Sequence, residues 1–162
     1  MRRAEPIAGL GGVLLLVALF LPWYALDVNF AADGATLVQQ HILVTGDPPE
    51  FTGWEALSVT DILLALLAVP AILVPVISLT TSGPAKAIGI DVIASATGWI
   101  AILLVAFRLL DPPGGNLDLR YGAWLALAGA ILAWVGSWLS MRDESTPGAV
   151  APDVPRRPIP KA

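Results

Sequence analysis

Residues 121–139 read YGAWLALAGAILAWVGSWL, a stretch without a single charged side chain. A helix needs about 20 apolar residues to cross the roughly 30 Å hydrocarbon core of a bilayer. The stretch is therefore expected to be a transmembrane helix. Three further apolar stretches of similar length precede it, at about 7–26, 59–79 and 87–110. Together they predict an all-α fold, a transmembrane four-helix bundle within residues 1–140.

The composition supports the membrane class. The chain has 162 residues, of which 56% are hydrophobic and 14% charged, and a mean hydropathy of +0.75. Soluble domains are about 25% charged. The net charge of −4 argues against a nucleic-acid partner. The absence of cysteine excludes disulfides, thiol nucleophiles and cysteine metal sites, and the single His41 excludes a multi-histidine site. We therefore expect no cofactor and no metal.

Lysine and arginine predict the orientation, because cytoplasmic loops are enriched in them. The loop 27–58 has neither, whereas both termini and the loop after the second helix contain seven such residues: Arg2, Arg3, Lys86, Arg142, Arg156, Arg157 and Lys161. Both termini are thus expected in the cytoplasm and 27–58 outside, in a multi-pass protein of the bacterial cytoplasmic membrane. The first helix could instead be a cleaved signal peptide, but its long apolar run ends in bulky residues, which favours retention.

The outer loop 27–58 and the tail 141–162 differ in character. In the loop, a turn at 31–34 separates residues 28–30 from 36–44, a pattern that can form a short β-ribbon. The tail is rich in proline and poor in large apolar residues, so it is expected to be a disordered cytoplasmic segment.

Three ionisable residues fall within the expected helices, and such residues are functional candidates by default. Asp61 and Arg108 should lie at the same depth near the outer surface, which predicts an interhelical ion pair. Alternatively, Asp61 caps its own helix in the stretch 58–61, and Arg108 reaches the headgroups or pairs with Asp111. Asp91 lies near the cytoplasmic end of the third helix, where it suits the helix dipole.

Aromatic residues cluster at the expected outer boundary of the membrane, where amphipathic rings prefer to lie. With an adjacent carboxylate they define a candidate outer contact surface: Trp23, Tyr24, Trp54, Glu55, Tyr121 and Trp124.

No nucleophile elbow, phosphate loop or HExxH pattern is present in the sequence. The leading hypothesis is therefore a non-enzymatic structural or interaction protein. Its partners would be the lipid bilayer and another membrane protein or a second copy of itself. The alternative is a small transporter or channel component. A third hypothesis is an enzyme that acts on lipid-linked substrates at the outer face through Asp61, Glu55 or Asp111.

Four sequence runs near the expected outer ends of the helices resemble the uncharacterised small four-helix membrane proteins of actinobacterial type. These runs are LPWY at 21–24, GWEALSVTD at 53–61, RLLDPP at 108–113 and RYGAWL at 120–125. The likeness covers about residues 1–144 and implies no activity. A weaker, topological resemblance is to claudins, which have four helices, internal termini and a tryptophan motif in a large first outer loop. Claudins also have two loop cysteines, which this chain lacks.

Overall fold

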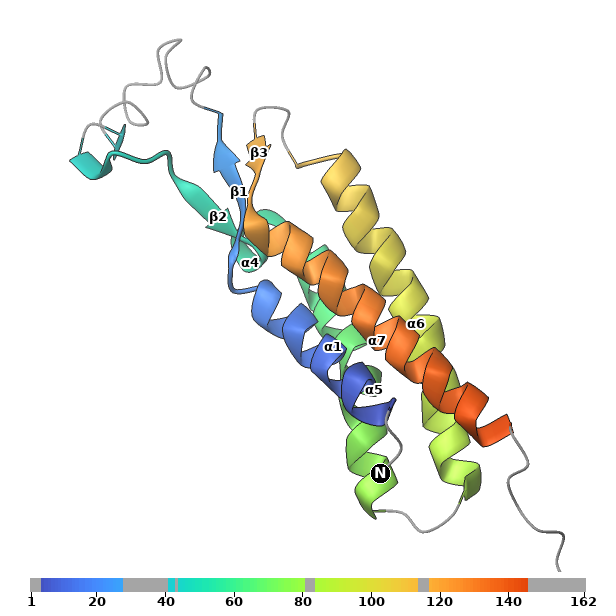
Figure 1. The fold of residues 1–162 in the computed structure, drawn as a ribbon. Coiled ribbons are helices and arrows are strands. Elements are labelled where there is room, and N and C mark those ends of the chain that lie inside the picture. The colour runs from blue at the N-terminus through green and yellow to red at the C-terminus, as the bar shows by residue number, and fades with distance from the viewer. Residues whose placement is uncertain (1–3, 28–40, 43, 81–83, 114–116, 146–162) are drawn as a thin grey trace, which may run out of the picture.

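The computed structural model describes residues 4–27, 41–42, 44–80, 84–113 and 117–145, most of which are helical. Helices α1 (Glu5–Ala18), α5 (Thr60–Thr80), α6 (Pro84–Leu110) and α7 (Tyr121–Ser145) run side by side. A small β-sheet and the one-turn helix α4 (Gly53–Ala56) lie at one end of them (Figure 1). We call this the sheet end, and the other the opposite end.

Three of these helices, α5, α6 and α7, are long and apolar enough to cross a membrane. The start of α5 and the end of α6 lie within one residue of expectation, whereas α7 continues beyond the expected 139 to Ser145. Residues 141–145, which were expected in the disordered tail, are therefore helical, and residues 146–162 lie outside the described ones.

The first apolar stretch is not one helix over 7–26, as the sequence predicted. Helix α1 ends at Ala18, and strand β1 (Pro22–Leu26) follows after a short turn. Pro22 explains the break, because it has no N–H for a helical hydrogen bond and disfavours the helical conformation of the preceding residue. At 14 residues, α1 is shorter than the three candidate spans.

Strand β1 is the centre of a three-stranded antiparallel sheet, flanked by β2 (Glu50–Thr52) and β3 (Leu117–Leu119). The register pairs Tyr24 with both Phe51 and Leu119. Strands β1 and β2 lie in the connection between α1 and α5, and β3 lies in the one between α6 and α7, so the sheet joins segments that are far apart in sequence. Within the ribbon expected at 28–30 and 36–44, the structure describes residues 41, 42 and 44, and these are helical rather than extended; the others lie outside the described residues.

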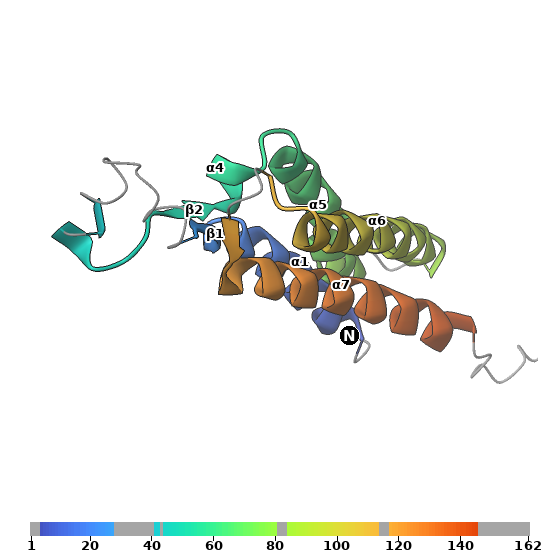
Figure 2. The same cartoon turned by 90° about the horizontal axis from the view of Figure 1, so that it is seen from above.

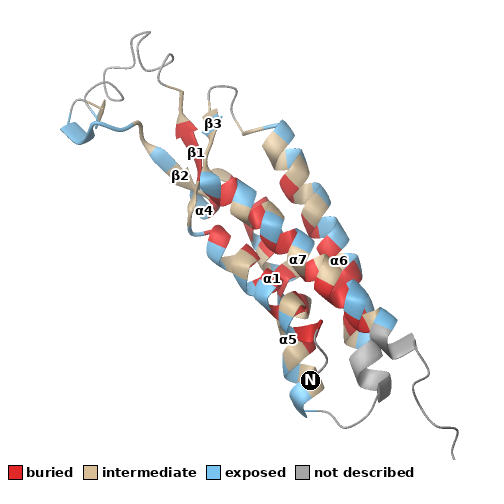
Figure 3. Cartoon of the chain, in the orientation of Figure 1, coloured by how far each residue is buried: buried red, intermediate tan, exposed pale blue. Residues whose placement is uncertain are grey.

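Many of the buried helix contacts are made by small side chains, and many large apolar side chains lie on the surface. Residues buried at the helix contacts include Ala68, Ala101, Ala126 and Ala130, which are at most 1% exposed. Leucines such as Leu66 and Leu103, by contrast, point outward and are more than 60% exposed. Figure 3 shows this alternation along each helix. Helices that pack in lipid have this arrangement, because small residues allow close contact and large apolar ones face the acyl chains.

Helix α1 packs between α5 and α7, and α6 packs against the same two helices on the other side (Figure 2). Glycines set the close distances on both sides of α1. A side chain on Gly9 would meet the ring of Pro75 at 2.7 Å, and one on Gly136 would overlap the backbone of Ala8. These contacts fix the position of each helix along its axis relative to its neighbours, and hence the position of the sheet at the end of the helices.

Candidate functional site

The sheet end is anchored by two aromatic residues of β1 that are completely buried. The indole Nε1 of Trp23 donates a hydrogen bond to the Ala18 carbonyl at 2.7 Å. The Trp23 carbonyl accepts one from the Arg120 amide at 2.8 Å, which ties β1 to the start of α7. Tyr24 is equally buried. Both residues were expected on an outer contact surface, but they support that end of the molecule from its core.

Two glycines let other elements approach Trp23. A side chain on Gly53 would lie 3.0 Å from both the Leu19 carbonyl and the Trp23 indole nitrogen. A side chain on Gly122 would collide with the Pro22 carbonyl. Helix α4 and the first turn of α7 therefore pack directly on β1, which makes the sheet continuous with the helices.

A polar network joins β1, α5 and α6 at this end. The Tyr24 hydroxyl donates to the Arg108 carbonyl at 2.9 Å, and Arg108 Nη2 donates to the Thr60 hydroxyl at 2.9 Å. Asp61, only 4% exposed, accepts a hydrogen bond from the Ile62 amide at 2.7 Å. Among the described residues no ion pair joins Asp61 to Arg108; the guanidinium contacts the hydroxyl of the residue before Asp61. Arg108 and Asp61 lie at the same end of the helices, but the guanidinium has a different partner from the one expected.

Burial raises the pKa of the Tyr24 hydroxyl to about 12, an effect that nearby Asp111 reinforces and the positive charge of Arg108 opposes. Removal of this side chain from water is the dominant cause, because the phenolate would lose its hydration. Tyr24 is therefore a neutral hydrogen-bond donor over the whole physiological range.

A second pair of polar residues lies near the opposite end. The carboxylate of Asp91 on α6 is 2% exposed and accepts a hydrogen bond from the Ser140 hydroxyl of α7 at 2.8 Å. Glu5 on α1 is also buried. The sequence identified Asp91 but neither Ser140 nor Glu5. A serine in an apolar helix gives no signal of its partner, and Glu5 precedes the first helix as expected at 7–26.

Between these two polar regions the interior is apolar, with a core that includes Leu15, Leu64, Ala101 and Val105. Arg108 follows Asp91 by 17 positions on the same helix, which corresponds to about 26 Å of rise. The two polar regions are thus separated by most of the helix length.

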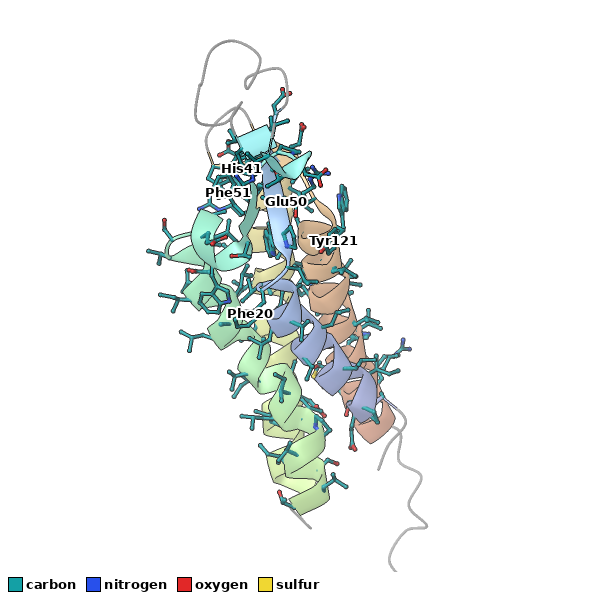
Figure 4. The ribbon with its side chains drawn as sticks, turned by 90° about the vertical axis from the view of Figure 1, so that its left-hand side faces the viewer. Phe20, His41, Glu50, Phe51 and Tyr121 are labelled. Atoms are coloured by element: carbon teal, nitrogen blue, oxygen red, sulfur yellow. The ribbon has the colours of Figure 1, made fainter. Side chains whose placement is uncertain are left out.

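Aromatic side chains are exposed around the sheet end. Trp124 and Tyr121 on α7 are more than half exposed, and Trp54 on α4 is 36% exposed. Phe20, which the sequence analysis did not single out, is 66% exposed, and its ring centroid lies 5.6 Å from that of Trp54. Figure 4 shows Phe20 and Tyr121 on different sides of the sheet end.

Glu55 is held in place by a capping box at the start of α4. Its Oε2 accepts hydrogen bonds from the Thr52 amide at 2.9 Å and from the Thr52 hydroxyl at 3.0 Å. These bonds lower the pKa of the exposed Glu55 carboxyl, because they stabilise its ionised form. The spacing at 58–61 suggested such a box there, but the structure forms one at 52–55.

A shallow apolar pocket of about 290 Å³ lies beside Glu55, on one face of the sheet. All three strands contribute to its lining, together with α4 and the connection between α6 and β3: Leu26, Phe51, Glu55, Ala56, Pro113 and Leu117.

The charge around the sheet end is predominantly negative. The described residues there include two arginines, Arg108 and Arg120, and both contact other residues of the chain. Arg120 Nε lies 3.3 Å from Glu50 Oε1 across the sheet, without an aligned hydrogen bond. The carboxylates outside the helix interior are more numerous: Asp27, Asp47, Glu50, Glu55, Asp111 and Asp118.

Within the described ranges no group of three or more histidine, aspartate and glutamate residues could hold a metal ion. No protein-family model matches the chain, and no curated protein or solved structure is significantly similar to it. The arrangement of its own residues is therefore the basis for any functional conclusion.

Proposed function

We propose that this chain is a non-enzymatic protein of the bacterial cytoplasmic membrane that presents its sheet end to another membrane protein. In this proposal α1 crosses the membrane with the three longer helices, which makes a four-helix bundle. Both termini lie in the cytoplasm, and the sheet end faces outward. The distribution of lysine and arginine supports this orientation.

One observation supports the interaction role most directly. The sheet end is a rigid platform, because hydrogen bonds of the buried Trp23 and Tyr24 connect its central strand to α1, to α6 and to the residue before α7. A platform of three strands and one helical turn has no role in spanning the bilayer, since the helices alone do that. Its exposed aromatic side chains, Trp54, Tyr121 and Trp124, are of the kind that enrich protein interfaces.

A transporter or channel component is the alternative. The two buried polar regions favour it only weakly, because the apolar core separates them by most of the helix length. A proton or ion pathway needs polar groups near the middle of the membrane. An enzyme that uses Asp61, Glu55 or Asp111 has less support, since Asp61 is buried and Glu55 is bound within its own capping box.

The proposal is tested by purification of the C-terminally tagged chain from native membranes in a mild detergent, with mass analysis of what remains bound. We expect a stoichiometric second protein. Trp54→Ala combined with Trp124→Ala should release it, whereas Trp138→Ala should not. Trp138 is a matched control, because it is 47% exposed but lies toward the opposite end of α7.

Recovery of the chain alone, or of a ring of identical copies, would contradict the interaction role. A flux assay in liposomes would then test the transport alternative, with neutralisation of Arg108 or Asp61 as the variants.

A further inference from the structure

One face of the sheet is apolar along its whole length, but only part of it is covered. The register places Leu26 opposite Leu117, and Tyr24 opposite Phe51. Because side chains alternate between the two faces of a strand, these four residues share one face. Tyr24, near the helices, is fully buried, whereas Leu26, Phe51 and Leu117 are half-buried and line the pocket. Figure 4 shows Phe51 at the sheet end, next to Glu50.

Glu55 gives this pocket a fixed negative charge. Both hydrogen bonds that its carboxylate accepts from Thr52 end on Oε2, and among the described residues none uses Oε1. The capping box therefore fixes the carboxylate while one oxygen remains able to accept from a partner. A preorganised group binds with a smaller entropy cost than a mobile one.

The charge around the pocket indicates which class of partner can bind there. Both arginines of the sheet end already contact groups of this chain, Thr60 and Glu50, whereas the carboxylates there outnumber them. Complementary potentials bring binding surfaces together and disfavour partners of like charge. The surface is therefore complementary to a cationic segment.

We propose that the pocket binds one apolar side chain of a protein segment in which basic residues flank that side chain, and that Glu55 contacts one of the basic groups. At about 290 Å³ the pocket is at the lower limit of sites for drug-sized ligands, and it suits a single side chain. This inference rests on the proposed interaction function, and it adds the chemistry of the partner.

The direct test uses the full chain in nanodiscs of phosphatidylcholine and three capped tripeptides: Lys-Phe-Lys, Lys-Gly-Lys and Glu-Phe-Glu. Equilibrium dialysis against loaded and empty nanodiscs measures binding. We expect measurable binding of Lys-Phe-Lys alone, because only this probe combines the apolar side chain with positive charge. Equal binding of Lys-Gly-Lys would refute the role of the pocket, and no binding of Lys-Phe-Lys would refute the proposal itself.

Two pairs of variants locate the site. Glu55→Gln should weaken binding at least about threefold, while the turn is retained because glutamine also forms a capping box. Asp118→Asn removes the same charge from the other face of the sheet and should change the affinity less than about twofold. Leu117→Trp should fill the pocket and abolish binding, and Leu110→Trp, at an 86% exposed position, should not. If Glu55→Gln and Asp118→Asn weaken binding equally, the attraction is general and the assigned contact is wrong.

The native-membrane purification separates this inference from the proposed function. If Leu117→Trp releases the co-purifying protein, both hold. If the partner is retained by Leu117→Trp but lost with the Trp54 and Trp124 substitutions, the interaction function holds and the pocket inference is wrong. If no partner co-purifies with the unaltered chain, the interaction function itself fails.

Discussion

The guanidinium of Arg108 and the hydroxyl of Thr60 are 2.9 Å apart, and this hydrogen bond joins the last turn of α6 to the first residue of α5. The backbone carbonyl of the same arginine accepts a hydrogen bond from the Tyr24 hydroxyl. Arg108 thus connects two helices and the central strand at the point where the helical part of the molecule meets the sheet.

A double-mutant cycle tests whether Arg108 and Thr60 act as a unit. Thr60→Val and Arg108→Met should each lower the free energy of unfolding by about 1–2 kcal/mol, because each removes a partly buried, charge-assisted hydrogen bond. The double variant should cost clearly less than the sum of the two. Steric trapping or chemical unfolding in detergent gives the required free energies.

The same cycle on Asp61 and Arg108 provides the control. Since the guanidinium contacts Thr60, we expect nearly additive effects for Asp61→Asn and Arg108→Met. A coupling between Asp61 and Arg108 larger than that between Thr60 and Arg108 would restore the ion pair that the sequence predicted.

Titration of Tyr24 tests its burial. The chain has two tyrosines, so Tyr121→Phe leaves Tyr24 as the only phenol. Its ultraviolet absorbance should change with a midpoint near pH 12, because the hydroxyl is buried and donates to the Arg108 carbonyl. A midpoint near the ordinary value of 10 in the folded protein would contradict this position.

The raised pKa of Tyr24 also has a consequence for stability. The stabilising contribution of the neutral phenol is complete below pH 10 and is lost as the pH rises through 12. Replacement by phenylalanine should therefore remove part of the decrease in unfolding temperature between pH 10 and 12. An unchanged decrease would assign the effect to other groups.

Two glycine-to-alanine substitutions should have opposite effects. Gly136→Ala places a methyl group against the backbone of Ala8, which cannot move aside as a side chain can, so it should destabilise the protein by about 3 kcal/mol or more. Gly89→Ala in α6 meets no atom within 4 Å and should be neutral or stabilising by up to about 1 kcal/mol. Thermal unfolding in detergent compares the two. Equal effects would contradict the close contact of α1 with α7.

The proposed orientation can be tested directly, because the chain contains no cysteine. In intact cells with a permeable outer layer, Asp118→Cys at the sheet end should react with a membrane-impermeant maleimide. Arg142→Cys, near the end of α7, should react only after the membrane is disrupted. The reverse pattern would invert the orientation, and reaction of both would contradict the transmembrane arrangement.

The long helices could be predicted because each is a continuous apolar run of spanning length bounded by glycine, proline or charged residues. Strand β1 could not be separated from the first such run, since a short apolar strand and a buried helical turn have the same composition. Strands β2 and β3 have three residues each, and their pairing depends on β1, which is distant in sequence.

For the candidate site, the sequence predicted at which end of the helices the polar residues lie, but not which residues contact each other. Spacing along the helices placed Asp61 and Arg108 at the same end, yet the choice of Thr60 as partner depends on side-chain geometry that spacing does not specify. Trp23 and Tyr24 resembled a membrane belt, because composition does not distinguish a ring at the bilayer surface from one in a core. The residues that line the pocket beside Glu55 come from separate segments of the sequence, and only the folded sheet brings these segments together in space.

The sheet has a consequence for the biosynthesis of the protein. Its central strand leaves the ribosome early, but β3 is synthesised only after α5 and α6, almost a hundred residues later. In the proposed transmembrane arrangement, the sheet can therefore close only once those helices have been inserted, with the start of α5 and the end of α6 on the same side. Its closure would mark the completion of insertion, and a chain halted after α6 would expose β1 without one of its two neighbouring strands.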